Sequence, residues 1–265
     1  MRYAKGTLVI TADGDIPLLR QVRNCRFVSR RQLFELLEHE AGQLSRSTYF
    51  SRLKRLIHAE HIRVLSGTGW RGSAIYSIAP AGLMELESRG EFSIALHSGT
   101  RHMPHPLHVY HALELNEIRL ALLRSSLLAG WQSDVEIASS NMVSGVFQKD
   151  YDALVKVWIG GAIREFALEY ERSLKAARRY AHIRAALESE RQVASVLYLA
   201  ASPDLTLALL YHLTPNTKPL AFATARHFCQ HLLATPVMTD LRAAMVTLDR
   251  FLADSLQQRL ARSGM

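Results

Sequence analysis

Residues 45–79 have the sequence SRSTYFSRLKRLIHAEHIRVLSGTGWRGSAIYSIA, and this stretch decides how the N-terminal part of the chain folds. Ser45 is a favourable N-cap residue, and the pattern after it predicts a helix over residues 46–60. Two β-like runs follow, and the glycine-punctuated GTGWRG between them predicts a hairpin with strands at 62–66 and 74–79. A helix followed directly by a β-hairpin is therefore expected here.

Three further helices are expected around this stretch. Asp15 is a candidate cap for a helix over residues 16–24, and Ser29 is a candidate N-cap for a helix over residues 30–40. After the hairpin the pattern returns to helix over residues 83–89. The predicted order is helix, helix, turn, helix, two strands and helix.

This order of elements, over about residues 15–90, resembles the winged helix-turn-helix fold. The resemblance implies that the domain binds DNA and that its third helix enters the major groove. A winged helix can also serve as a protein-interaction module, and that alternative stays open.

The expected third helix divides into two faces when its residues are projected at 100° per residue. Phe50, Leu53 and Ile57 define the expected buried face. The opposite face and its flanks carry guanidinium, hydroxyl and phenol groups, and arginine can grip guanine or a phosphate through two hydrogen bonds. Arg71, at the tip of the hairpin, is expected to reach the DNA backbone or the minor groove. The candidate DNA-binding residues are Arg46, Thr48, Tyr49, Ser51, Arg52, Lys54, Arg55 and Arg71.

The charge of the chain favours a polyanionic partner. The 265 residues include 32 Lys and Arg against 24 Asp and Glu, which gives a net charge of +8. Between residues 20 and 72 there are eleven Lys and Arg and four Glu, so this stretch alone holds +7. Because the excess coincides with the expected helix-turn-helix, double-stranded DNA is the expected partner. No segment reaches the roughly 18 apolar residues of a membrane helix, so no membrane partner is expected.

The segment HSGTRHMPHPL, residues 97–107, has no apolar periodicity and is typical of a linker. We therefore expect a DNA-binding domain at residues 1–95 and a linker at 96–107. An α/β domain is expected at 108–236 and a C-terminal amphipathic helix at 237–265.

The C-terminal helix is expected to begin after Thr239 as its N-cap. Its apolar seam could pair with a second copy of the chain, which would make the protein a dimer that binds two half-sites. The alternative is that the helix packs on its own domain. The residues of the seam are Leu241, Met245, Leu248, Leu252 and Leu256.

The region after the linker predicts the order helix–β–β–β–helix–β–helix–β. Strands are expected at residues 131–138, 151–159 and 164–171, and the continuously apolar run at 193–201 is typical of a buried central strand. This order resembles the core of the PD-(D/E)XK nuclease superfamily. The whole chain is therefore expected to have an α+β fold, in which the second domain is a restriction-endonuclease-like α/β domain with a mixed sheet.

The resemblance to these nucleases implies a candidate catalytic site. Asp152 lies where the superfamily has an aspartate before the second strand, and Glu169 lies in the next strand. Two carboxylates on adjacent strands could share Mg²⁺. Glu171 stands where an active member has lysine, although Lys175 or Arg172 could substitute for that lysine. Further ligands could come from Glu114, Glu117 or Glu136.

The combined layout resembles the replication-relaxation family. The resemblance rests on the winged helix, on Trp131 and Glu136 in a strand, on Asp-Ala-Leu at 152–154, on Leu-Glu-Tyr-Glu-Arg-Ser at 168–173 and on Tyr180. It implies an accessory DNA-binding protein of a plasmid or mobile element, with a role in replication, mobilisation or transcription regulation and with relaxosome, replication or transcription partners. It does not imply catalysis. A Mg²⁺-dependent DNA endonuclease and a protein-interaction adaptor remain the alternatives.

Cysteine and histidine usage adds two expectations. Cys25 and Cys229 are far apart and lack metal-binding spacing, so both are expected to be free, buried thiols in the reducing cytoplasm. No cofactor is expected other than Mg²⁺ for an active nuclease site. Histidines spaced every third residue could hold zinc, but a linker followed by a helix N-terminus is the favoured interpretation. These histidines are His102, His105, His108 and His111.

Overall fold

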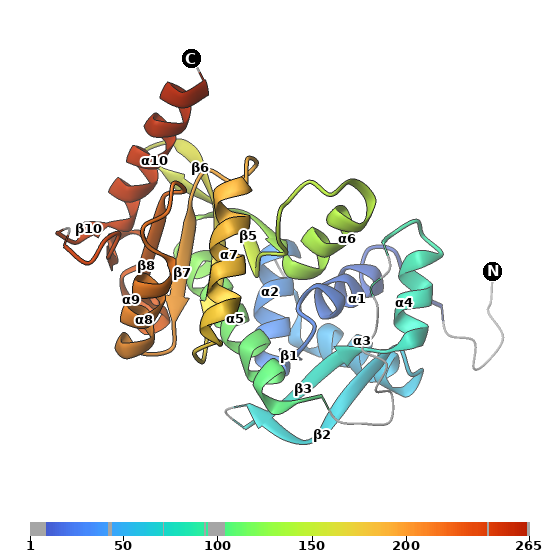
Figure 1. Cartoon of the computed structure of the whole chain (residues 1–265). Coiled ribbons are helices and arrows are strands. Elements are labelled where there is room, and N and C mark those ends of the chain that lie inside the picture. The colour runs from blue at the N-terminus through green and yellow to red at the C-terminus, as the bar shows by residue number, and fades with distance from the viewer. Residues whose placement is uncertain are drawn as a thin grey trace. The chain divides into compact units, whose positions relative to one another are not determined.

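The computed structural model describes residues 9–41, 44–70, 72–92, 94, 104–242 and 244–263. These residues form a mixed α+β protein with ten α-helices and several sheets (Figure 1). The largest sheet has five strands. The chain divides into two compact units, Met1–Asn116 and Glu117–Met265, and the boundary falls within helix α5 (Pro106–Arg124). Of the segment expected to be a linker, residues 96–103 lie outside the described residues and Pro106 and Leu107 belong to α5.

The first unit contains the expected helices and hairpin. Its three strands form an antiparallel sheet in the order β1-β3-β2, with Ile62 opposite Ile78 and Val28 opposite Tyr76. The strands of the hairpin are longer than expected, because pairing continues through Gly69 and Trp70 after an irregularity in the register. The elements are α1 (Asp15–Asn24), β1 (Val28–Ser29), α2 (Arg30–Ala41), α3 (Arg46–His58), β2 (Ile62–Trp70), β3 (Ser73–Ile78) and α4 (Pro80–Glu87).

Among the helix caps expected in the first unit, those of α1 and α2 have different outcomes. At the start of α2 the Ser29 N–H donates to Gln32 Oε1 at 3.1 Å and the Gln32 N–H donates to Ser29 Oγ at 3.3 Å, which confirms Ser29 as the N-cap. At the start of α1 the N-cap is Gly14, and Asp15 is the first helical residue. The expectation that Asp15 caps this helix from outside was therefore wrong. Its side chain is fully buried instead.

Buried leucines of α1, α2 and α3 and buried residues of the hairpin form the core of the first unit. The first part of α5 joins this unit because Val109 and Leu113 pack with Leu65 and Ile75 of the hairpin. The contact is reinforced by Gln32, whose side-chain amide donates to the Leu113 carbonyl at 2.8 Å. Burying these apolar surfaces is the main favourable contribution to the folding of such a unit.

The second unit is built on a five-stranded mixed sheet in the order β4-β5-β6-β7-β8. The pairs β4–β5 and β5–β6 are antiparallel, whereas β6–β7 and β7–β8 are parallel. The tight turn between β5 and β6 uses Gly160 and Gly161, whose φ angles of 56° and 79° suit glycine in a hairpin of this kind. The strands are β4 (Leu128–Ser133), β5 (Ala153–Ile159), β6 (Ala162–Glu171), β7 (Val196–Ala200) and β8 (Leu220–Thr224).

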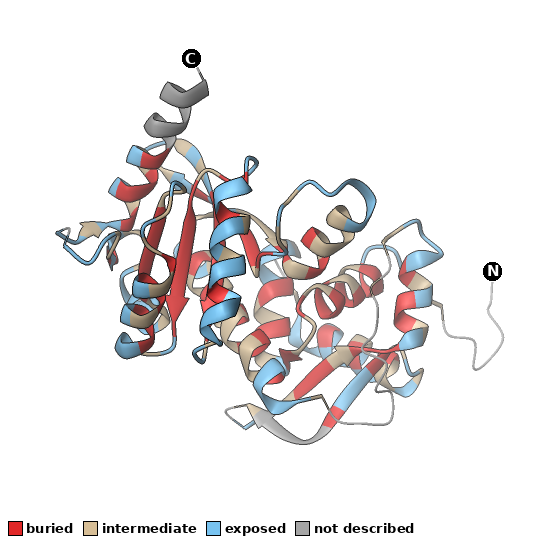
Figure 2. Cartoon of the chain, viewed as in Figure 1, coloured by how far each residue is buried: buried red, intermediate tan, exposed pale blue. Residues whose placement is uncertain are grey.

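Helices α7 and α8 supply the apolar cover of one sheet face. Leu209 and Leu210 of α8 pack with Tyr198 of β7 and Phe222 of β8 in one buried cluster, which also takes in Tyr180 of α7. Every residue of β7 is buried, as Figure 2 shows, and this confirms that the apolar run at residues 193–201 contains a buried strand, which lies between β6 and β8 in the sheet. The remaining elements are α6 (Asp134–Ser144), α7 (Ala177–Ser189), α8 (Pro203–Leu213), α9 (Ala225–His231), a 3-10 helix (Leu232–Ala234), β9 (Pro236–Val237), β10 (Val246–Thr247) and α10 (Leu248–Ser263).

Two expectations about the second unit were wrong. The strand expected at residues 131–138 ends at Ser133, because Ser133 and Glu136 form a reciprocal capping box that starts α6. The C-terminal helix begins at Leu248 rather than after Thr239, because β9 and β10 pair before it. The expected dimer seam is therefore interrupted: Leu241 and Met245 lie outside the helix and are exposed. Leu248 and Leu252 are buried, and the side chain of Leu256 lies outside the described residues.

A substitution at Gly82 of α4 tests the close packing of α4 on the segment before β2. A Cβ at this position would come within 2.4 Å of the His61 carbonyl oxygen and within 2.7 Å of Ile78 Cδ1. We expect Gly82→Ala to lower the free energy of unfolding by about 1–3 kcal/mol, as measured by urea denaturation. The matched control is Gly130→Ala on β4, where the Cβ would meet only the flexible Lys156 side chain at 3.4 Å or more. Equal stabilities of the two variants would contradict this account.

Candidate functional site

Helix α3 presents a polar face to solvent, but this face is rotated from the expected one. Tyr49, Leu53 and Leu56 are its buried residues, whereas Phe50, which the projection placed at the centre of the buried face, is 45% exposed. Ile57 is only partly buried. The exposed residues of α3 are Arg46, Ser47, Thr48, Phe50, Ser51, Lys54 and His58.

Tyr49 belongs to the core rather than to a DNA-binding face, so its placement on an exposed flank was wrong. Its side chain is fully buried and packs edge-on against Phe34, with ring centroids 5.2 Å apart. The phenol donates a hydrogen bond to the Arg30 carbonyl oxygen at 3.1 Å, which satisfies its one polar group. Burial raises the pKa of the Tyr49 hydroxyl well above its ordinary value.

The two arginines expected at the centre of the DNA-binding face lie toward α1. Arg55 forms an ion pair with the buried Asp15, and the Arg52 guanidinium lies against Gly14, where it would collide with any Cβ. Arg52 also lines a cavity of about 200 Å³ together with Asp13. Neither arginine is fully buried, and each has a neighbour at the start of α1.

The Asp15 carboxylate explains this orientation. Its Oδ2 accepts from the Thr11 N–H at 2.8 Å and from the Thr11 hydroxyl at 2.9 Å, in addition to the Arg55 ion pair. Burial acts to raise the pKa of Asp15, but the Thr11 hydrogen bonds and Arg55 outweigh it and hold the pKa below its ordinary value. Asp15 therefore stays charged although it is buried, and it connects α1 to α3 through its ion pair with Arg55.

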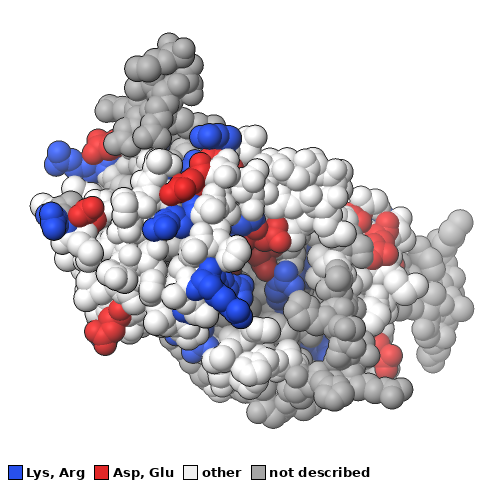
Figure 3. Space-filling view, viewed as in Figure 1, with Lys and Arg blue, Asp and Glu red and all other residues white. Residues whose placement is uncertain are grey.

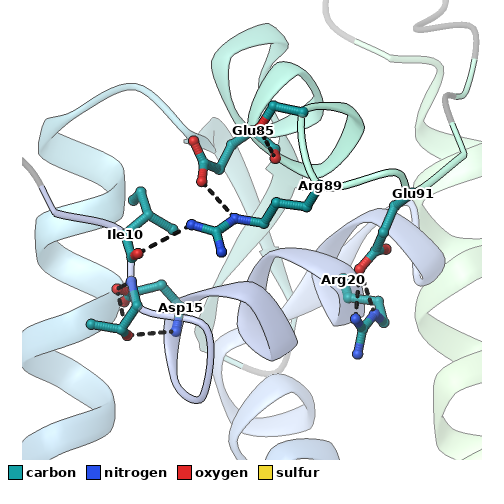
Figure 4. Close-up of polar contacts among 8 residues, drawn as sticks. Ile10, Asp15, Arg20, Glu85, Arg89 and Glu91 are labelled. Carbon is teal, nitrogen blue, oxygen red and sulfur yellow. Dashed lines mark hydrogen bonds and ion pairs between the residues drawn. The ribbon is translucent and has the colours of Figure 1, made fainter.

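Several other cations of the first unit form ion pairs within it. Arg89 pairs with Glu85 at 2.8 Å and donates to the Ile10 carbonyl, while Arg20 lies 2.5 Å from Glu91 (Figure 4). Buried Arg23 shares Glu91 at 2.9 Å. Among the described residues of this unit, the cations that make no ion pair with a carboxylate are Arg30, Arg46, Arg52, Lys54 and Arg63. Arg71 lies outside the described residues.

The carboxylates expected to form a catalytic site come together in the second unit. Asp152 immediately precedes β5, and Glu169 and Glu171 lie two residues apart on β6, so both glutamates point to the same face of the sheet. The register pairs Ala153 with Leu168, which brings Asp152 beside Glu169. Glu169 and Glu171 are buried, and Asp152 accepts a hydrogen bond from the Tyr170 N–H at 2.7 Å.

Each buried glutamate has its own lysine. Lys149 Nζ lies 2.5 Å from Glu169 Oε1, and Lys175, which follows β6, forms an ion pair with Glu171. Lys175 is the residue expected to replace the missing catalytic lysine. Sequence analysis did not single out Lys149, although its place three residues before Asp152 was visible. The two ammonium groups neutralise the two glutamates inside the unit.

A tyrosine that sequence analysis also missed completes this cluster. Tyr198 of β7 pairs with Glu169 in the strand register and is almost fully buried. Its hydroxyl has no hydrogen-bond partner among the described residues. Burial, together with the nearby charge of Glu169, raises the pKa of Tyr198 well above its ordinary value. Its apolar neighbours on β7 had suggested a purely structural strand, so no signal in the sequence set this tyrosine apart.

Each of the three carboxylates has an internal donor. Lysines engage Glu169 and Glu171, and a backbone N–H donates to Asp152. Glu136, a further candidate ligand, accepts from Ser133 in the capping box instead. Within the part of the chain that the structure describes, no three His, Cys, Asp or Glu side chains could hold a metal ion.

The other candidate ligands lie on α5 and in the segment that was expected to be a linker. Glu114 belongs to the first unit, and Glu117 of α5 is close enough to Cys229 of α9 to affect it electrostatically. His105 and His108 lie 5.8 Å apart, measured between ring centroids, while His102 is outside the described residues.

Both cysteines are free, and they differ in exposure. Cys25 is buried, as expected, but Cys229 is exposed, so the expectation that both thiols are buried was wrong for Cys229. No helix in the described ranges has the length and apolar character to cross a membrane.

Comparison of the chain with protein-family models, curated proteins and solved structures found no match in any of the three. The proposed function therefore rests on the residues of the chain and their geometry.

The Glu169 cluster generates a pH-dependent prediction. Burial, opposed by Lys149 and reinforced by Asp152, raises the pKa of Glu169 to about 7 from an ordinary value of 4.5. Between these two values the folded protein holds a proton that the unfolded chain releases, so the free energy of unfolding falls as pH rises. We expect this loss to be on the order of 3 kcal/mol between pH 5 and pH 8, and Glu169→Gln to abolish it.

Urea denaturation at several pH values measures this effect. Relative to the wild type, Glu169→Gln should gain stability as pH rises, because glutamine does not titrate. Glu165→Gln on the same strand is the control, since the Glu165 side chain is 42% exposed and should leave the pH profile of the wild type unchanged. If the free energy of unfolding changes with pH in the same way for all three proteins, ionisation of Glu169 does not destabilise the fold, and the prediction is wrong.

Proposed function

We propose that the protein binds double-stranded DNA through its first unit, a winged helix-turn-helix domain whose helix α3 enters the major groove. We propose further that it serves as an accessory or regulatory protein of a plasmid or mobile element, in replication, mobilisation or transcription control. The second part of this proposal is supported by the sequence resemblance to the replication-relaxation family.

The observation that carries the DNA-binding proposal is the composition of the exposed face of α3. This helix contains no acidic residue, and its solvent side offers the Ser47, Thr48 and Ser51 hydroxyls together with Lys54. Hydroxyl and ammonium groups suit both base edges and phosphates. The order α1, α2, α3 and a β2–β3 hairpin agrees with the element order of winged helix-turn-helix domains.

The distribution of neutralised and free charge supports the same proposal. Carboxylates within the unit satisfy Arg20, Arg23, Arg31, Arg55 and Arg89. The remaining described cations that make no ion pair lie on α3, at the first residue of α2 and on β2, which are the elements that meet DNA in such domains. Over the second unit, the face drawn in Figure 3 intersperses Lys and Arg with Asp and Glu.

We propose that the second unit is a nuclease-like but non-catalytic scaffold. Its carboxylates resemble a nuclease site in their placement on adjacent strands, but Lys149 and Lys175 neutralise them. Because each of these lysines already faces a buried glutamate, its positive charge is balanced inside the unit, which favours a role of the cluster in the fold over a role in hydrolysis. A Mg²⁺-dependent endonuclease acting through Asp152 and Glu169 is the alternative that the experiment below separates from this proposal.

Fluorescence anisotropy with mixed-sequence duplex DNA tests DNA binding. We expect binding to weaken steeply with salt, because phosphate contacts release counterions. Arg46→Ala and Lys54→Ala should each weaken binding and reduce the slope of log K against log salt concentration by about 1. Arg184→Ala, an exposed arginine of α7, is the matched control and should behave as the wild type does. Binding that is insensitive to salt, or equally weakened by the control, would sink the proposal and favour a protein-interaction adaptor.

Incubation of supercoiled plasmid with the protein tests whether the second unit cleaves DNA. We expect the plasmid to stay supercoiled in the presence of Mg²⁺ or Mn²⁺. Cleavage by the wild type that disappears in Asp152→Asn would overturn the proposal and establish the nuclease. Cleavage that persists in Asp152→Asn would indicate a contaminating enzyme.

A further inference from the structure

Phe50 is a large aromatic side chain exposed in the middle of a polar surface. Its ring is 45% exposed on α3, with Ser47 one turn before it, Ser51 beside it and Lys54 one turn after it. The ring packs near Tyr49, with ring centroids 5.2 Å apart, and nearly half of the residue is exposed to solvent. Leaving this apolar surface in water is unfavourable, so covering it with an apolar group of a partner would contribute to affinity.

Two arginines of α2 and α3 lie in this region, one of them near the ring itself. Arg30, at the first residue of α2, places its guanidinium 6.0 Å from the Phe50 ring centroid. Arg46 lies one turn before Phe50 and reaches over Phe34 at 5.4 Å. Neither arginine forms an ion pair with a carboxylate among the described residues. A partner that covers Phe50 should therefore place an apolar group on the ring and negative charges beside the arginines. A purely apolar protein surface would not do so.

The major groove of DNA offers one group of this kind. Thymine alone among the four bases presents a methyl group there, and phenylalanine is one of the side chains that contact it. Phe50 is the fifth residue of α3, in the N-terminal half, which is the part of a recognition helix that contacts base edges. Phosphates on either side of the groove would then lie within reach of the flanking arginines.

We infer that Phe50 contacts a thymine methyl group in the major groove and thereby makes the protein select thymine at one position of its site. This inference rests on the proposed DNA-binding function and adds a specific base contact to it. Phe50 supplies the apolar surface, while Arg30 and Arg46 hold the adjacent backbone.

The test replaces thymine by uracil, which removes only the methyl group. A bound duplex is first enriched from a random pool with the full-length wild-type protein, and each thymine in the enriched site is then replaced in turn. At one position we expect uracil to weaken binding by the wild type about fourfold, the value of one buried methyl group. Phe50→Ala should bind the thymine duplex more weakly and should not distinguish it from the uracil duplex.

Two further variants keep the outcome interpretable. Phe50→Leu retains an apolar side chain and should retain part of the preference for thymine, while Arg184→Ala on α7 should keep the full preference. Circular dichroism verifies that each variant is folded. The inference is overturned if the enriched site contains no thymine, if no uracil weakens wild-type binding, or if Phe50→Ala keeps the wild-type preference. In each of these cases salt-dependent binding of duplex DNA would leave the proposed function standing, whereas absence of any duplex binding would reject both.

Discussion

The orientation of α3 depends on one buried ionic contact, the pairing of Asp15 with Arg55. Asp15 is fully buried at the start of α1, and a buried carboxylate is tolerated only when donors satisfy it. Thr11 and Arg55 supply those donors, so the Arg55 side of α3 turns toward α1. Ser47, Ser51 and Lys54 of the same helix are exposed to solvent.

The same constraint shapes the second unit. Glu169 and Glu171 are buried on one face of β6, and Lys149 and Lys175 provide the opposite charges. Neutralisation in place lets the sheet keep carboxylates that would otherwise cost several kcal/mol each to bury. Burial still dominates at Glu169, whose pKa stays above its ordinary value despite the neighbouring ammonium. In this cluster each carboxylate thus has an internal donor.

Local signals predicted much of the fold. The helices of the first unit, the hairpin and the central strand lie where periodicity and capping residues placed them, because those features depend on residues close together in the chain. The capping box of Ser133 and Glu136 had a visible Ser-x-x-Glu signal, yet the apolar residues around it suggested a strand. The late start of α10 left no such signal, since it depends on the pairing of β9 with β10, which are separated by several residues of loop.

The rotation of α3 about its own axis could not be predicted from the sequence. Leu53 belongs to two sets of apolar residues that both have helical spacing. One set adds Phe50 and Ile57 to it, and the other adds Tyr49 and Leu56. The sequence by itself determined that a cationic helix follows a turn and precedes a hairpin, and that acidic residues lie on neighbouring strands. Only the tertiary structure decided which set is buried and which lysines meet which carboxylates. Those choices arise from contacts between α1 and α3 and between the strands and their flanking loops, where the residues in contact are distant in the chain.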